Sequence, residues 1–213
     1  GQGCLQRRFP GYKKRTCILI EFLRGWDVER QMYFLKPLIV LTLIALALYS
    51  FGSRGDWRTA SRESAGIAPD PTVTSEAVLQ VYGADAWGWR GWFAIHTWIA
   101  AKRKNENHYT IYDVIGWRGY HGGVVMGINR GLPDRYWYGA KPRLLKSHRG
   151  AQAEALIEAV DDAARSYPWK QEYQAFPGPN SNTFTAWVAR QVPELELELP
   201  FSAIGSGYVD QAD

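Results

Sequence analysis

Cysteine is almost absent from this sequence: its 213 residues include only Cys4 and Cys17. Residues 18–213 therefore hold no disulfide and no thiol nucleophile, which excludes a small disulfide scaffold and a thiol mechanism in that part. Histidine is also scarce, with four residues that form neither an HExxH motif nor a Cys/His cluster. We accordingly predict no metal site and no cofactor.

Excess basic charge is missing from most of the chain, although the net charge is +4. Residues 1–36 contain eight Lys or Arg against three Asp or Glu, whereas the remainder contains 17 basic and 18 acidic residues. A nucleic-acid-binding domain is expected to carry basic residues over its folded part. This distribution predicts no nucleic-acid partner.

A long apolar run occurs once, at residues 32–51, where Lys36 is the only charged residue. Twenty helical residues cover the roughly 30 Å hydrocarbon core of a bilayer, so we predict a single transmembrane helix and a lipid bilayer as partner. A cleavable signal peptide is the alternative, but the long basic leader and the poor cleavage site at 50–52 favour an uncleaved anchor.

The flanks of the run predict its orientation. Basic residues are concentrated before it, which predicts a cytoplasmic N-terminus, with 1–31 as a basic or interfacial segment, and an outer C-terminal domain. The side chains expected at the membrane interface are Trp26, Tyr33, Lys36, Tyr49 and Trp57.

Beyond the run, residues 52–75 are rich in Gly, Ser, Pro and charge and are predicted to form an extended tether. Residues 76–213 hold strand-like segments followed by amphipathic helices. This order predicts an α+β domain, an antiparallel sheet with two or more packed helices. The expected strands are 77–82, 91–101, 108–117, 124–128 and 135–138, and the expected helices are 151–166 and 182–191.

Two histidines are candidate catalytic residues. His96 lies within one expected strand and His108 opens the next. Adjacent antiparallel strands joined by a short turn would bring both rings to one end of the sheet. A packed or hydrogen-bonded imidazole is the alternative role for each.

The sequence PGPNSNTF at 177–184 is the other candidate site. Ser181 falls at a helix N-terminus, where free backbone N–H groups stabilise an anion. A nucleophile there would have an oxyanion site but would need a histidine as base. The alternative is plain helix capping by Asn180 and Ser181, which are common cap residues.

The motifs PGPNSNTFTAWVAR and IHTWIA resemble a family of bacterial membrane-anchored proteins defined only as a domain of unknown function, over about residues 55–208. This resemblance implies a bacterial inner-membrane protein with a periplasmic domain.

The order His96, His108, Asn180-Ser181-Asn182-Thr183-Phe184 is also similar to the permuted papain-like proteins of the NlpC/P60 and lecithin:retinol-acyltransferase type. That resemblance implies Ser181 in the place of their nucleophilic cysteine and His96 as base. It also implies His108, or by a longer extrapolation Asp113, as the group that orients His96, and the Asn182 and Thr183 amides as oxyanion donors.

Two functions follow from these patterns. Because the usual cysteine is replaced by serine, we favour a non-catalytic accessory or scaffold subunit that associates with other membrane-protein subunits. The alternative is a serine-dependent hydrolase or acyltransferase acting on envelope lipid or peptidoglycan amide or ester bonds. Trp and Tyr are concentrated around the expected strands, where they could form a ligand groove or a partner surface.

Overall fold

The computed structural model describes residues 33, 35–47 and 56–212, and the chain divides into two units, Gly1–Arg54 and Gly55–Asp213. In the first unit, residues 35–47 are helical and expose large apolar side chains such as Leu38, Leu41 and Leu43. Among the described residues, no helix has both the length and the apolar character needed to cross a bilayer. The predicted span extends to 32 and 48–51, which lie outside the described residues.

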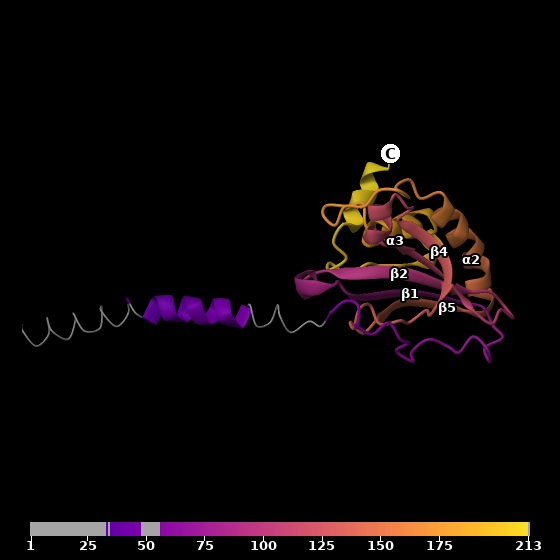
Figure 1. Cartoon of the computed structure of the whole chain (residues 1–213). Coiled ribbons are helices and arrows are strands. Elements are labelled where there is room, and N and C mark those ends of the chain that lie inside the picture. Colours follow the sequence, from indigo (N-terminus) through magenta and orange to yellow (C-terminus); the bar gives the residue numbers. More distant parts are fainter. Residues whose placement is uncertain (1–32, 34, 48–55, 213) are drawn as a thin grey trace, which may run out of the picture. The chain divides into compact units, whose positions relative to one another are not determined.

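The second unit is built on a five-stranded sheet in the order β4-β3-β2-β1-β5, with every neighbouring pair antiparallel. This confirms the predicted α+β class with an antiparallel sheet (Figure 1). The strands are β1 (Val78–Asp85), β2 (Ile95–Lys102), β3 (Tyr109–Val114), β4 (Met126–Gly131) and β5 (Arg143–Arg149).

The observed strands differ from the expected ones in three ways. The predicted strand at 135–138 contributes only isolated bridges, at Arg135 and Trp137. Strand β5 was not predicted, because it is an edge strand whose charged residues hide the alternation of a half-buried strand. Short 3₁₀ helices also replace the ends of two expected strands, at Gly88–Trp92 and Gly116–His121.

Helices α2 (Gly150–Arg165) and α3 (Ser181–Gln191) pack on one face of the sheet, as Figure 1 shows. The apolar spacing in α2 buries Leu156, Val160 and Ala163 against that face, as the 3.6-residue period predicts. Phe184 and Val188 of α3 join the same core. We call this side of the sheet the helix face.

The other side, the loop face, has a core that contains Tyr82, Trp98, Tyr109 and Trp137. Figure 1 shows that loops rather than helices cover it. Strand alternation assigns each residue to a face: Trp98 and Ala100 belong to the loop face, and Ile99 and Ala101 to the helix face.

Residues 56–75 belong to the predicted extended tether, and several of them are hydrogen-bonded to the domain. Buried Asp134 accepts hydrogen bonds from Ser64 Oγ at 2.7 Å, Ile67 N at 2.7 Å and Ala68 N at 3.1 Å. Tyr109 Oη donates to Pro69 O at 3.0 Å. The segment contains turns at 57–59 and 71–73, and specific acceptors on the domain fix its backbone.

Candidate functional site

The N-terminus of α3 is closed by Asn180, whose side-chain oxygen accepts hydrogen bonds from Asn182 N at 2.9 Å and Thr183 N at 3.2 Å. Thr183 Oγ1 accepts in return from Asn180 N at 3.0 Å, which completes a capping box. Gly205 leaves room for the Asn180 amide group, since a Cβ there would collide with it. The cap is therefore Asn180, and Ser181 is the first helical residue rather than a second cap.

This cap bears directly on the predicted oxyanion site. The Asn182 and Thr183 amides, which the papain-like resemblance implies as oxyanion donors, already donate to Asn180. An oxyanion site requires donors aimed at the reacting oxygen. Using these amides for acyl transfer would first require breaking the capping box.

The Asn182 side chain anchors the helix to strand β2. Its Nδ2 donates to Ile95 O and Ile204 O, both at 2.9 Å, and its Oδ1 accepts from Thr97 Oγ1 at 2.9 Å. Thr97 lies on the helix face by strand alternation and also reaches Ser181 O at 3.2 Å. The strand residue facing the predicted nucleophile is thus Thr97, not a histidine. In the sequence, the only indication that Thr97 would contact the α3 N-terminus was its position next to His96.

His96 lies on the loop face, opposite to α3. Its ring stacks on Trp137 with 3.5 Å between ring centroids and 5° between planes. Its Nε2 is buried without a hydrogen-bond partner, and within residues 56–212 no hydrogen bond joins His96 to Ser181. The predicted base and the predicted nucleophile are therefore not hydrogen-bonded to each other.

The surroundings of His96 also disfavour its protonation. Burial is the main cause that holds the pKa of the imidazole well below 6.5, and the positive charges of Arg135 and Arg118 add to the effect. A general base must become a cation during the reaction. His96 is thus a neutral, stacked ring near neutral pH.

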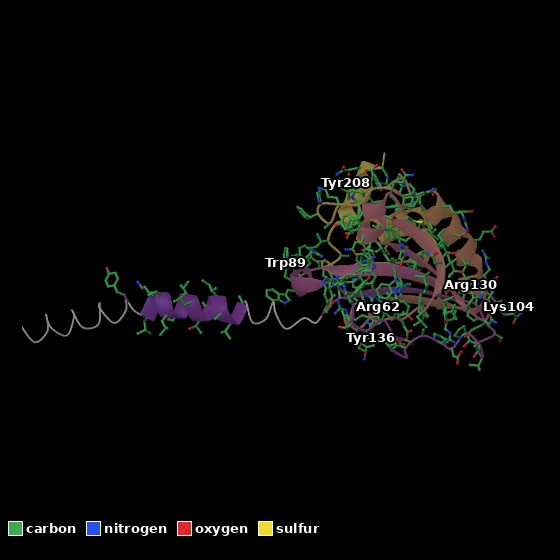
Figure 2. The ribbon with its side chains drawn as sticks, viewed as in Figure 1. Arg62, Trp89, Lys104, Arg130, Tyr136 and Tyr208 are labelled. Atoms are coloured by element: carbon green, nitrogen blue, oxygen red, sulfur yellow. The ribbon has the colours of Figure 1, made fainter. Side chains whose placement is uncertain are left out.

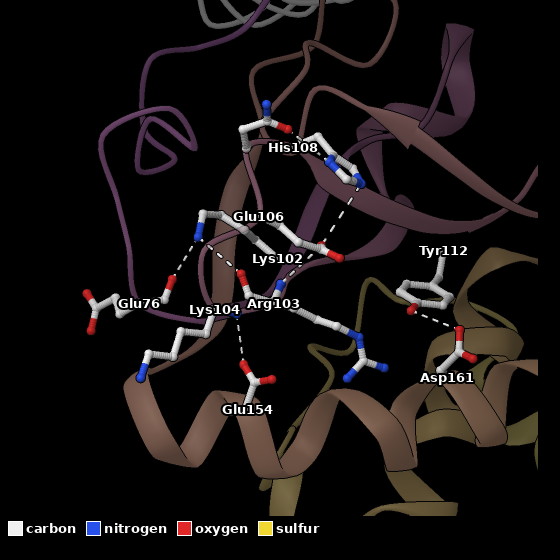
Figure 3. A network of polar contacts seen from close by, with 10 residues as sticks. Glu76, Lys102, Arg103, Lys104, Glu106, His108, Tyr112, Glu154 and Asp161 are labelled. Carbon is white, nitrogen blue, oxygen red and sulfur yellow. Dashed lines mark hydrogen bonds and ion pairs between the residues drawn. The ribbon is translucent and has the colours of Figure 1, made fainter.

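His108 lies at the other end of the sheet from His96, which corrects the expectation that the two meet. His96 is the second residue of β2, which ends at Lys102. The turn after Lys102 leads into β3 at Tyr109, so His108 lies at the end of β2 that is far from His96. Figure 3 shows His108 in the hairpin network, with Nδ1 3.3 Å from Asn107 Oδ1 and Nε2 4.0 Å from Glu106 Oε2. Figure 2 likewise shows Lys104 of this hairpin and Trp89 at opposite ends of the sheet.

Asp113 does not orient His96 either. Its carboxylate is held by Arg118 Nη1 at 2.6 Å and Arg135 Nη2 at 2.7 Å. Those two contacts occupy both oxygens of a buried side chain. Asp113 therefore belongs to an ion-pair cluster on the loop face.

An aromatic cavity of about 520 Å³ opens at the end of the sheet where β2 begins. Ser181 and His96 both line it, together with Trp87, Trp117 and Phe176. The Ser181 hydroxyl makes no hydrogen bond within the described part of the chain, although the residue is only 4% exposed. A second hollow of about 450 Å³ shares the side chains of Trp87 and Trp117.

Aromatic side chains around this cavity are also exposed. They come from the β1–β2 connection, the β3–β4 connection and the segment before α3, and they include Trp89, Trp92, Phe93, Tyr120 and Phe176. Clusters of exposed aromatic side chains are more common at binding surfaces than elsewhere on a folded domain, which makes this end of the sheet the candidate site. The sequence indicated the aromatic surplus but not that the three connections would gather it at one end.

The residues predicted at the membrane interface are only partly described. Tyr33 and Lys36 lie in the helical segment and are exposed, and Trp57 lines the second hollow. Trp26 and Tyr49 lie outside the described residues, as does the predicted cytoplasmic segment 1–31.

The fold and its end cavity define an α+β domain with an aromatic cavity beside a capped helix. The chain belongs to the family described as "Protein of unknown function (DUF3750)", whose model matches residues 76–208. No curated protein and no solved structure matches the chain.

Proposed function

We propose that the domain binds the apolar part of an envelope lipid in the aromatic cavity and is not an enzyme. The occupied amides of Asn182 and Thr183 carry this proposal, because acyl transfer at Ser181 would need them free. The placement of His96 on the loop face also supports it. Aromatic walls with a few polar groups are typical of sites for small apolar ligands.

The chain is further proposed to be a single-pass protein of the bacterial inner membrane with the domain in the periplasm. The apolar run at 32–51 supports an anchor, and the basic residues before it support a cytoplasmic N-terminus. A periplasm-dependent reporter fused after Asp213 should be active. Activity of the same reporter fused after Arg30 would contradict the proposed topology and indicate a periplasmic N-terminus.

A spin-labelled fatty acid that quenches tryptophan fluorescence tests the cavity. The full chain in a nonionic detergent should show saturable quenching by the probe. Phe176→Ala removes an aromatic wall of the cavity and should weaken binding about tenfold, equivalent to about 1.4 kcal/mol of lost apolar contact.

Phe201→Ala is the matched control, because Phe201 is fully exposed and does not line the cavity. It should leave the quenching curve unchanged. Equal quenching in the wild type and both variants would reject the cavity as the site.

Serine-dependent acyl transfer is the second candidate, and one observation favours it: Ser181 and His96 line the same cavity. If this is the function, an active-site-directed phosphonate labels the wild type but neither Ser181→Ala nor His96→Ala. The binding proposal predicts no specific labelling of Ser181 in any of the three.

The accessory role predicts association with other membrane proteins. The full chain extracted from native membranes in a mild detergent should migrate as a complex larger than its own 24.2 kDa. Deleting residues 1–30 should weaken that complex while the domain stays folded. A monodisperse monomer under several mild detergents would contradict the accessory role and leave the binding domain as an independent protein.

A further inference from the structure

A second cavity, of about 240 Å³, lies on the loop face and is rich in guanidinium groups. Arg62, Arg118 and Arg135 line it, and Asp113 is the one carboxylate among its lining residues. Arg130 also lines it from the edge strand β4, but strand alternation assigns its side chain to the helix face. Three guanidinium groups and one carboxylate leave a net charge of +2.

Asp113 occupies only some of the N–H donors of Arg118 and Arg135. Asp113 Oδ1 accepts from Arg118 Nη1 and Oδ2 accepts from Arg135 Nη2. Arg62 Nη2 donates to Trp57 O at 2.8 Å, and its guanidinium carbon lies 4.2 Å from the centre of the Tyr138 ring. Each guanidinium has five N–H donors in a planar fork, so several remain for an additional acceptor.

The guanidinium groups are held in position before any ligand arrives. Arg135 lies over the rings of Trp98 and Trp137, with its Cζ 5.3 Å and 5.8 Å from the two ring centroids. Gly127 leaves space for Arg118, because a Cβ at that position would collide with Arg118 Nη1. Figure 2 shows Arg62 and Tyr136 on the side of the sheet away from the helices.

We propose that this cavity is a binding site for a phosphate group. Arginine forks match phosphate oxygens with paired, charge-assisted hydrogen bonds, and a dianionic phosphate would balance the +2 charge of the lining. The site goes beyond the aromatic cavity: Trp137 lines both, but Arg62, Arg118 and Arg135 line only this one.

Calorimetric titration of inorganic phosphate into the full chain in a nonionic detergent tests the site. The wild type should bind phosphate saturably. Arg118→Gln and Arg62→Gln should each weaken binding about tenfold, as expected for loss of a hydrogen bond between charged groups. Arg62 is exposed, so its variant keeps the test valid if Arg118→Gln fails to fold.

Arg143→Gln is the matched control, because it removes the same charge from β5, at the opposite edge of the sheet. It should leave phosphate affinity unchanged. An equal loss in all three variants would show that only net charge matters and would overturn the site.

A second arm distinguishes the source of the phosphate. Mixed micelles containing phosphatidic acid, whose phosphate monoester can carry two negative charges, replace inorganic phosphate, and neutral micelles serve as the blank. If the protein binds the lipid micelles but not inorganic phosphate, and the Arg62 and Arg118 variants bind the micelles more weakly, the site is assigned to a lipid headgroup. If neither ligand binds, the site is refuted, whatever the fatty-acid probe shows for the aromatic cavity.

Discussion

The helix face and the loop face of the sheet are built from different residues. The helix face buries aliphatic side chains such as Leu79, Val81 and Ile99 under α2 and α3. The loop face buries aromatic rings together with the polar side chains of His96, Asp113 and Asp134. The helices satisfy most of their own backbone groups, so apolar packing holds them for the most part, and buried polar contacts are concentrated at the N-terminus of α3.

Loops have no regular backbone hydrogen bonds, and a buried loop needs acceptors and donors from elsewhere. On the loop face Asp134 supplies acceptors to residues 64–68, and Trp98 Nε1 donates to Pro133 O at 2.7 Å. The comparison teaches that the helix face mainly supplies stability, whereas the loop face positions charged and aromatic groups. Both proposed ligand sites use charged or aromatic side chains.

The largest expected effect tests the helix face. Phe184→Ala removes a fully buried ring that meets Tyr167 edge-on at 5.3 Å between centroids, and should lower the free energy of unfolding by about 3–5 kcal/mol. Urea titration followed by circular dichroism measures it, with exposed Phe201→Ala as the control that should cost almost nothing. A loss below about 1 kcal/mol would show that this core is not tightly packed.

The loop face is tested by Asp134→Ala. Loss of three hydrogen bonds to a buried carboxylate should cost about 2–3 kcal/mol and release residues 61–75. Limited proteolysis should then cut in that segment, with the rest of the domain intact. Asp85→Ala is the control, since its exposed pair with Arg143 contributes at most about 1 kcal/mol. Unchanged proteolysis would mean that the segment is held by its apolar contacts.

The junction between α3 and the start of β2 is tested by two neighbouring substitutions. Asn180→Ala loses the cap and should cost about 2 kcal/mol. Ser181→Ala should change stability by less than about 0.5 kcal/mol, because its hydroxyl makes no hydrogen bond within the described residues. Thermal melts compare them. Equal losses would mean that Ser181 shares the capping role.

The last effect concerns pH. The unfolded chain protonates His96 near its ordinary pKa of 6.5, whereas the folded chain keeps the ring neutral to lower pH. The unfolded state then binds more protons, so the free energy of unfolding should fall as pH drops below 6.5, by up to about 1.4 kcal/mol per pH unit. His96→Phe keeps a ring against Trp137 and removes the titration.

The measurement is urea unfolding of the wild type and His96→Phe at several values between pH 5 and pH 7. The stability of the wild type relative to His96→Phe should fall as the pH drops from 7 to 5. Parallel curves would contradict a neutral buried imidazole and would reopen His96 as a base.

Local patterns predicted the elements that carry strong local signals. The apolar spacing of 151–166 predicted α2 to within a residue of its observed bounds, and the Asn-rich stretch before 182 predicted the start of α3. Edge strand β5 was missed because its pairing with β1 depends on a distant part of the chain. A hairpin tip at 102–107 was a correct prediction, but the expected meeting of His108 with His96 was wrong. A hairpin brings two strands together at its own turn, and His96 lies at the other end of β2.

The sequence alone determined the fold class, the absence of a thiol in the domain, the capped helix and the surplus of aromatic residues. Only the tertiary structure decided which face each strand residue occupies. Strand β2 is buried on both faces, so IHTWIA has no polar alternation to show that Thr97 faces α3 and His96 faces Trp137. A shift of one residue would exchange them. The register that prevents it is set by long-range pairing with β1 and β3 and by the Asn182 side chain bonded to Ile95 O.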